Sequence, residues 1–235
     1  MDVTHYALVT GPFVGRTSLS AVALALREAG AKVTEPDPHA AFPDALPSLE
    51  TWAEALMEMI PSSPAPILVG YSVATVLAAW LAPKVGAKAV IFLDGEIPAE
   101  NGPNPIFSDR VTRHLSGKVE DATLPHWSDW WTGLGLEEGL GTGPLGRDRA
   151  DLVPILRAEE RRFPADWLGQ SLDMPQWRDM PVGYVRLSPF YDQALQDAEM
   201  LGWPVAHVDG SHLHTVLNGV ETAGALMAVA GELLG

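Results

Sequence analysis

The sequence ILVGYSVATVLAAWL occupies residues 67–81. Its first three residues are aliphatic, which is typical of a buried strand, and the Ala, Val and Leu run from Ser72 to Leu81 predicts a buried helix. Gly70 and Ala74 stand two positions on either side of Ser72, and small residues there let the backbone make a tight turn. The segment therefore predicts a strand, a sharp turn and a helix, with the serine hydroxyl projecting from the turn.

Strand-like and helix-like runs alternate on both sides of this segment. We predict further strands at 6–9, 33–34, 89–93, 182–187 and 205–208. We predict further helices at 18–29, 49–60, 192–201 and 220–234. This alternation is typical of a parallel sheet with crossover helices, so the chain is assigned to the α/β class.

Residues 99–181 have a different character. Gly, Pro and charged residues are frequent there, and five of the eight tryptophans fall within it, at 127, 130, 131, 167 and 177. We therefore expect one core made of residues 1–98 and 182–235, with 99–181 as an insertion.

The composition excludes several classes of function. The chain has 235 residues, no cysteine, and 15 Lys plus Arg against 30 Asp plus Glu, for a net charge of −15. A surface of that sign repels phosphate backbones and anionic headgroups, so we expect no nucleic-acid or membrane partner. The lack of cysteine excludes disulfides, thiol nucleophiles and thiolate metal sites, and no other cluster predicts a metal ion.

Two further features bear on location. The segment from Met1 to Tyr6 lacks the basic region of a signal peptide. The longest apolar stretch, 67–82, is shorter than the roughly 18 to 20 residues that a membrane span needs, and it stops at Pro83. We expect a cytoplasmic protein, and the richness in Ala, Gly and Pro suggests a role in secondary metabolism.

A second motif, DGSHLH, occupies residues 209–214, directly after the last predicted strand. It places a histidine on a loop at the carboxyl edge of the sheet. Ser72 followed by His212, each just past a strand, matches the chain order in which a nucleophile comes first and its histidine base last. We predict His212 as the base, with His214 as the alternative.

These motifs together resemble the α/β-hydrolase superfamily. The resemblance rests on Leu8–Gly11, Gly70–Ala74, Phe92–Pro98 and Gly210–His212, and it covers the chain apart from 99–181. It implies a mostly parallel central sheet flanked by helices, with 99–181 as a helical cap, or lid, inserted after the sixth family strand. It implies no cofactor.

The resemblance leaves the acid of the catalytic triad open. Members of the superfamily usually carry it after the strand that precedes the histidine strand, which here points to Asp192. Others carry it one strand earlier, where Asp94 ends a clean apolar run. We favour Asp94, keep Asp192 as the alternative, and leave Glu96 as a third candidate.

The resulting hypothesis is a serine hydrolase. Ser72 would attack an ester, lactone or thioester, and His212 would take its proton. The oxyanion would be held by the N–H of Val73 and, because Pro12 has none, by that of Phe13, with Val14 as a substitute. The missing donor at Pro12 keeps a second hypothesis open, in which the same fold carries out a lyase, cyclase or proton-transfer reaction.

Aromatic residues suggest the substrate class. Trp127, Trp130 and Trp131 would share one face of a helix, where they either line the pocket or form the core of the lid. With Tyr71 beside the nucleophile, they predict a neutral, mainly apolar small molecule as substrate. A homodimer is left open.

A less favoured hypothesis comes from another class of enzyme. Residues 7–15, the Gly30–Val33 turn and Asp37 resemble the opening of an NAD(P)-dependent short-chain dehydrogenase. Arg16 stands near the place where the third glycine is needed, and this hypothesis explains neither Ser72 nor His212.

Overall fold

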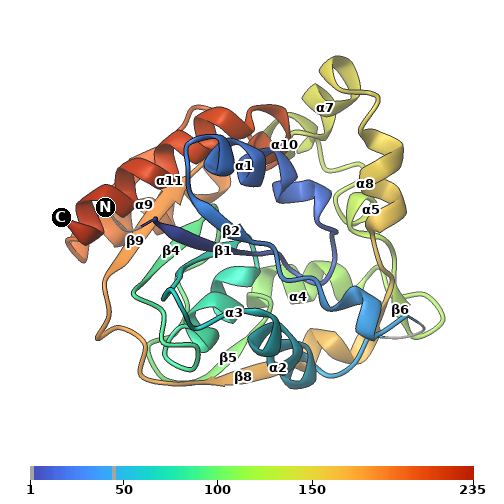
Figure 1. Cartoon of the computed structure of the whole chain (residues 1–235). Coiled ribbons are helices and arrows are strands. Elements are labelled where there is room, and N and C mark those ends of the chain that lie inside the picture. Colours follow the sequence, from blue (N-terminus) through green and yellow to red (C-terminus); the bar gives the residue numbers. More distant parts are fainter. Residues whose placement is uncertain (1–2, 44–45) are drawn as a thin grey trace.

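The structure is a computed structural model that describes residues 3–43 and 46–235 (Figure 1). Met1 and Asp2, which begin the segment assessed for a signal peptide, lie outside the described residues. Within the described part of the chain, no helix combines the length and the apolar character needed to cross a bilayer.

A six-stranded parallel sheet forms the centre of the molecule, in the order β10-β9-β4-β3-β1-β2. The strands are β1 (His5–Val9), β2 (Lys32–Thr34), β3 (Ile67–Tyr71), β4 (Ala89–Leu93), β9 (Val182–Arg186) and β10 (Val205–His207). Because β2 and β3 lie on opposite sides of β1, the winding reverses there. In open α/β sheets, ligands bind in the crevice at the carboxyl ends of the strands beside such a reversal.

This order bears on the dehydrogenase hypothesis. A dinucleotide-binding sheet places its first strand between the second and the fourth. Here β1 lies between β2 and β3. The sheet therefore differs from the one that the glycine pattern suggested.

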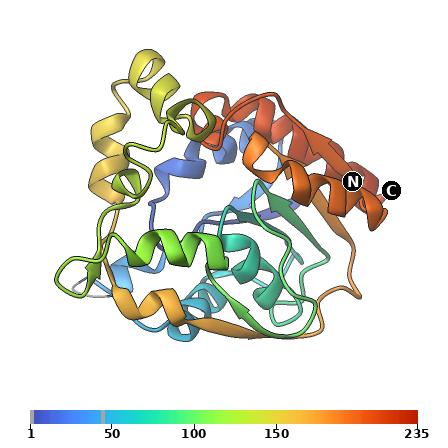
Figure 2. The same cartoon turned by 180° about the vertical axis from the view of Figure 1, so that it is seen from behind.

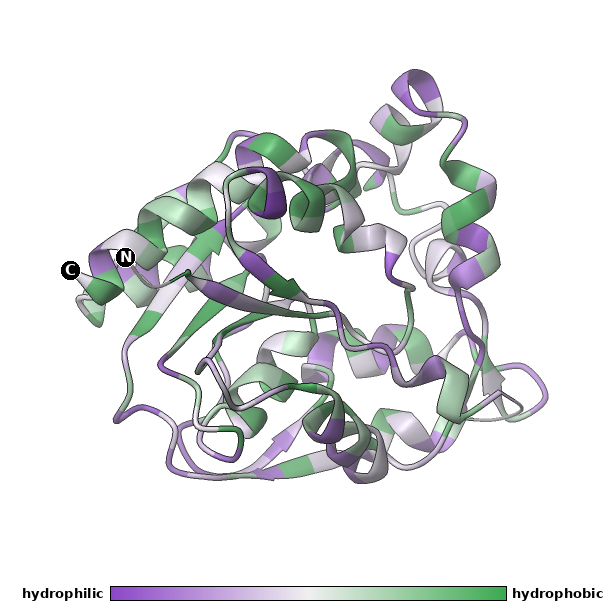
Figure 3. Ribbon diagram, viewed as in Figure 1, coloured by the Kyte–Doolittle hydropathy of each residue, from purple (hydrophilic) through white to green (hydrophobic). Residues whose placement is uncertain are grey.

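Helices cover both faces of the sheet. Tyr6 and Leu8 of β1 pack toward α1 (Thr17–Glu28) and α11 (Gly219–Leu234), while Ala7 and Val9 pack on the opposite side. That side is covered by α2 (Leu49–Met59), α3 (Ala74–Leu81) and α9 (Asp192–Met200). Successive residues of a strand point to opposite faces, which explains the continuous apolar runs of strands buried on both sides. Figure 3 shows hydrophobic and hydrophilic residues side by side on α1 and α11, as expected for helices with one buried face.

The predicted α/β class is confirmed, and most predicted elements match the observed ones closely. The strand predicted at 67–69 continues to Tyr71, and the helix predicted from Ser72 begins at Ala74. The turn between them therefore consists of Ser72 and Val73.

Residues 99–181 join β4 to β9. They contain five α-helices, α4 (Asp109–Ser116), α5 (Trp127–Trp130), α6 (Glu137–Leu140), α7 (Thr142–Asp148) and α8 (Val153–Glu159), and the 3₁₀ helix η2 (Ala165–Gly169). Figures 1 and 2 show α5, α7 and α8 stacked beside the carboxyl edge of the sheet. We call residues 99–181 the cap.

The expectation of a purely helical cap is wrong in one respect. The cap also holds two antiparallel strand pairs, β5 (Gly102–Pro105) with β8 (Ser171–Met174), and β6 (Thr123–Leu124) with β7 (Phe163–Pro164). In β8, Leu172 and Met174 are buried, whereas Ser171 and Asp173 are exposed. Such strands are too short to show a clear alternation in sequence, and each depends on a partner far along the chain.

Two contacts fasten the cap to the core. The Glu159 carboxylate accepts hydrogen bonds from the Thr17 amide (2.9 Å) and the Thr17 hydroxyl (2.8 Å), at the N-terminus of α1. The ring of Phe13 lies between cap aromatics, 5.1 Å from the ring of Phe107 and 4.1 Å from that of Phe163. A carboxylate at a helix N-terminus also interacts favourably with the helix dipole.

We expect Glu159→Ala to lower the free energy of unfolding by about 1 kcal/mol, because two donors at the start of α1 lose their acceptor. The melting temperature, followed by circular dichroism, should fall by about 2 to 4 °C. Glu232→Ala, an exposed site on α11, is the matched control and should leave it unchanged. Equal melting temperatures for both variants would contradict this role for Glu159.

Candidate active site

Ser72 lies in the turn between β3 and α3 with a φ of 60°, a conformation that is strained for any residue other than glycine. Its amide donates to the carbonyl of Leu93 on the neighbouring strand (2.9 Å). Two glycines make room for the turn. A Cβ at Gly70 would lie 2.5 Å from the carbonyl oxygen of Ala74, and one at Gly95 would lie 2.3 Å from that of Ser72. The importance of Gly95 was not evident from the sequence, because it packs on the turn from another strand end.

His212 lies in the loop after β10 with its ring between two polar side chains. Its Nε2 is 3.0 Å from the Ser72 Oγ, and its Nδ1 is 2.7 Å from the Asp94 Oδ2. The backbone of His212 is held on both sides, since its amide donates to the carbonyl of Gly139 in the cap (2.8 Å) and its carbonyl accepts from the Tyr71 hydroxyl (2.7 Å). The loop therefore presents the imidazole in one orientation.

Tyr71 was predicted to contact substrate. Its ring stacks on that of His212, with the ring centroids 4.9 Å apart, and it also forms part of the cavity wall described below. Burial raises the pKa of its phenol well above the ordinary value, so the hydroxyl stays a donor to the His212 carbonyl. In the structure, the Tyr71 ring packs against the His212 ring, and the Tyr71 hydroxyl holds the His212 backbone.

Asp94 directly follows β4, with a φ of 45°, and is fully buried. Its Oδ1 accepts from the amides of Leu187 and Ser188, at 2.7 Å each. Its Oδ2 accepts from the Ser188 hydroxyl (2.7 Å) in addition to His212. These donors offset the cost of burying a carboxylate and hold it in one orientation.

The alternative residues lie elsewhere. Asp192 is exposed and accepts from the Arg186 guanidinium (Nε to Oδ1, 2.7 Å). His214 pairs with Glu221 (2.9 Å), and Glu96 lies in the cavity wall. The structure thus brings together Ser72, His212 and Asp94, whereas the alternative acid Asp192 contacts Arg186 and the alternative base His214 contacts Glu221.

A cavity of about 600 Å³ opens beside Ser72 and His212. The core contributes to its wall Gly11, Phe13, Val14, Tyr71, Val73 and Tyr191. The cap contributes Phe107, His114, Trp127, Trp130, Trp131, Leu140, Leu145, Leu156, Arg157 and Glu160. The wall is mainly apolar, and the cap supplies most of it.

The three cap tryptophans differ in their surroundings. The ring of Trp127 lies 6.4 Å from that of His212, and the ring of Trp131 stacks on that of His114 at 5.4 Å. Trp130 is only 1% exposed and packs on Phe13 at 5.0 Å. The expectation of one shared helical face is wrong, because α5 ends at Trp130 and Trp131 follows it. Trp130 therefore belongs mainly to the core of the cap.

The predicted oxyanion donors come from the turns after β1 and β3. Those turns touch, since a Cβ at Gly11 would lie 2.6 Å from the Val73 Cγ2. Phe13 and Val73 both line the cavity. Within residues 3–43 and 46–235, the amides of Phe13 and Val73 donate to no other group of the protein.

Tyr191 was missed by the sequence reasoning, which considered its turn only as a source of the acid. Its ring lies 5.7 Å from that of His212, and it lines the cavity. Burial raises the pKa of the Tyr191 phenol. The phenol therefore stays neutral at the cavity wall.

No protein-family model matches the chain, and no curated protein matches it in sequence. Several solved structures are similar in fold. Tomato methylketone synthase I in complex with 2-tridecanone has a TM-score of 0.69 at 15% identity, covering 99% of this chain and 100% of that one. Polyneuridine aldehyde esterase has a TM-score of 0.68 at 14% identity (97% and 100%), and a pyrethroid hydrolase 0.66 at 15% (100% and 100%). On the evidence of its sheet, its cap and these neighbours, the chain has the α/β-hydrolase fold.

Proposed function

We propose that the protein is a serine hydrolase that cleaves an ester, lactone or thioester of a mainly apolar small molecule. One observation carries the proposal: the Ser72 Oγ, the His212 imidazole and the Asp94 carboxylate form a continuous hydrogen-bonded array, with distances of 3.0 and 2.7 Å, at the wall of an apolar cavity. Such an array lets a serine hydroxyl act as a nucleophile at neutral pH.

The geometry supports a two-step reaction. His212 Nε2 takes the proton as the Ser72 Oγ attacks the carbonyl carbon, and it then returns that proton to the leaving group. Asp94 holds Nδ1–H and fixes the tautomer in which Nε2 accepts. The amides of Val73 and Phe13 would stabilise the oxyanion. Water, activated by the same imidazole, then releases the acid.

The cap is proposed as the substrate-binding lid of this enzyme, over the core formed by 1–98 and 182–235. Its apolar and aromatic side chains supply most of the cavity wall. Burial of apolar surface would then provide most of the binding energy.

A serine-directed fluorophosphonate tests the proposal directly. We expect one covalent adduct on the peptide that contains Ser72, located by mass spectrometry, and turnover of at least one member of a panel of p-nitrophenyl esters, aryl thioesters and lactones. The Ser72→Ala variant is the control for labelling. A chain that takes up no label and turns over none of the panel would not be a serine hydrolase.

Pro12 favours a second candidate, a non-hydrolytic reaction at the same residues. It has no N–H at the place where the second oxyanion donor is expected, and its carbonyl accepts from His39 Nε2 (3.0 Å), which fixes the turn. A crystal structure of the phosphonate adduct distinguishes the two. A phosphonyl oxygen about 3 Å from both the Val73 and the Phe13 nitrogens supports hydrolysis. Contact with Val73 alone, together with inert esters, lactones and thioesters, supports the lyase or proton-transfer candidate.

We expect Trp131→Ala to raise KM for bulky aryl esters by about tenfold more than for acetate esters, because the indole forms part of the cavity wall. Steady-state kinetics on a series of acyl chain lengths measures this. Trp203→Ala, outside the cavity wall, is the control. An equal change for short and long esters would assign Trp131 to cap packing alone.

A further inference from the structure

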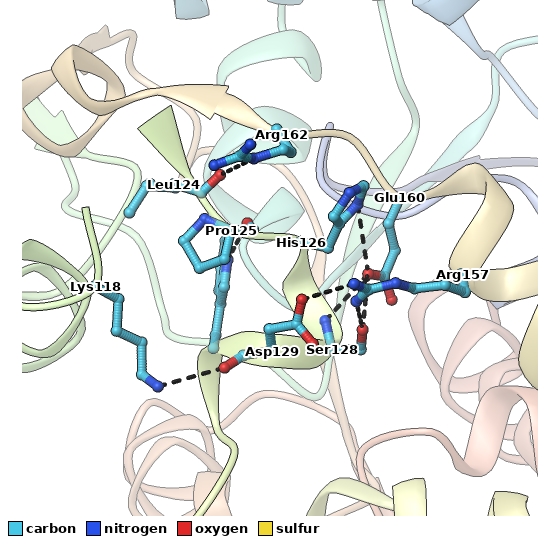
Figure 4. Close-up of polar contacts among 10 residues, drawn as sticks. Lys118, Leu124, Pro125, His126, Ser128, Asp129, Arg157, Glu160 and Arg162 are labelled. Carbon is cyan, nitrogen blue, oxygen red and sulfur yellow. Dashed lines mark hydrogen bonds and ion pairs between the residues drawn. The ribbon is translucent and has the colours of Figure 1, made fainter. Parts of the chain in front are cut away.

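Glu160 is one of several charged residues in the mainly apolar wall of the cavity. It directly follows α8, and its side chain is only 4% exposed. Its Oε2 accepts from the Ser128 amide (3.2 Å), the Ser128 hydroxyl (2.9 Å) and the Arg157 Nη1 (3.1 Å) (Figure 4). One carboxylate oxygen is therefore fully occupied by donors from the cap itself.

Neighbouring groups keep this arrangement rigid. The Arg157 guanidinium also donates to the Ser128 hydroxyl and to the Asp129 Oδ2 (2.7 Å), and Lys118 donates to the Asp129 carbonyl (3.4 Å). His126 Nδ1 lies 3.9 Å from the same Glu160 oxygen. Figure 4 shows His126, Ser128 and Arg157 around the Glu160 carboxylate, with Lys118 farther away and in contact with Asp129.

The second oxygen, Oε1, is different. Among the described residues no donor contacts it, yet it is not one of the fully buried polar atoms that lack a partner. It therefore keeps accessible surface, and Glu160 is a lining residue of the cavity. Burial raises the pKa of the carboxyl, the effect expected of a charge that its surroundings compensate only in part. Among the described residues, Oε1 is thus an acceptor without a donor, on a side chain that belongs to the cavity wall.

Glu160 and the triad share the cavity through Trp127. The ring of Trp127 lies 6.4 Å from that of His212, and the next residue, Ser128, binds Glu160. A molecule bound at Ser72 and extending along Trp127 would reach the carboxylate.

We propose that Glu160 Oε1 is a second binding point for the substrate and accepts a hydrogen bond from a hydroxyl or ammonium group remote from the reacting carbonyl. This inference rests on the proposed function and narrows its substrate class to amphiphiles, with an apolar body and one hydrogen-bond donor. A group that can only accept, such as an ether oxygen, would face the carboxylate with no hydrogen bond to offset its desolvation.

Binding of unreactive ligands tests this without any turnover. Isothermal calorimetry on the unmodified protein compares phenylbutylamine, phenylbutanol and the methyl ether of phenylbutanol, which share the apolar body. We expect the amine, the alcohol or both to bind about tenfold more tightly than the ether, the effect of one hydrogen bond to a charged group. Tighter binding of the amine alone would mean that the site selects an ammonium group. Tighter binding of both the amine and the alcohol would mean that it accepts any hydrogen-bond donor. Equal affinity for all three would overturn the inference and leave the hydrolase proposal standing, whereas failed fluorophosphonate labelling would leave the binding result intact.

Substitutions at Glu160 test whether this residue gives the tenfold binding preference. In Glu160→Gln, the amide oxygen is needed by Ser128 and Arg157, so the NH₂ faces the cavity and the tenfold preference should vanish. Glu120→Gln removes a charge from an exposed site of the same cap and should preserve it. If Glu160→Gln does not fold, Glu160→Asp keeps the charge but withdraws the carboxylate, and the preference should fall at least threefold. A preference retained in both Glu160 variants, or lost equally in Glu120→Gln, would rule out Oε1 as the acceptor.

Discussion

Ser72→Ala is expected to lower kcat for an activated ester by about 10⁴-fold or more, because the attacking oxygen is removed while the rest of the site stays in place. The side chain lies at the cavity wall, and alanine meets the same steric constraint at a φ of 60°. The melting temperature should therefore stay within about 2 °C of that of the wild type. Burst kinetics with p-nitrophenyl butyrate, followed by steady-state turnover, measures the loss.

The double variant Ser72→Ala/His212→Ala tests whether the two residues act together. His212→Ala alone should cost about as much as Ser72→Ala, and the two together should cost little more, because they act as one unit. Additive losses would mean that Ser72 and His212 contribute separately. Turnover by Ser72→Ala within tenfold of wild type would reject the nucleophile assignment.

Asp94→Asn is expected to lower kcat by about 10⁴-fold with little change in KM. An asparagine amide that keeps the acceptor contacts to Leu187 and Ser188 turns its NH₂ toward His212 Nδ1. It would stabilise the tautomer whose Nε2 carries the proton and cannot accept one from Ser72. Single-turnover rates and the ¹⁵N chemical shifts of the imidazole report the loss and the tautomer separately.

Asp192→Asn is the control for that experiment, since it makes the same change at the other candidate acid. Its carboxylate pairs with Arg186 at the surface, so kcat should stay within about twofold of wild type. A loss in Asp192→Asn as large as that in Asp94→Asn would return Asp192 to the list of triad acids.

Local sequence was enough to predict the sheet, its crossover helices and the positions of Ser72 and His212. These features depend on short patterns: an apolar strand, small residues around a turn, and a histidine just past a strand. The choice between Asp94 and Asp192 is different in kind. It depends on a positive φ at Asp94 and on the amides of Leu187 and Ser188, at the end of the neighbouring strand. The residues around Asp94 and Asp192 in the sequence do not reveal these contacts.

Several of the missed parts require the cap to be docked. Glu160 meets Ser128 only after the chain has returned through α8, and β5 finds β8 across most of the cap. The helix expected to carry Trp131 stops one residue short of it: α5 is a single turn, and its last residue, Trp130, packs on Phe13 and Phe107. Hydrophobic spacing describes a face but not where a short helix ends.

The hydrogen bond from the His212 amide to Gly139 has a consequence for protein engineering. The amide of the next residue, Leu213, donates a similar hydrogen bond to the carbonyl of Leu140 (2.9 Å). Two consecutive residues of the cap therefore hold the backbone of the histidine loop. Grafting a foreign cap in place of 99–181 would remove these two hydrogen bonds along with the old pocket. A chimera intended only to change selectivity would also lose turnover, and one that retains Gly139 and Leu140 in register should recover it.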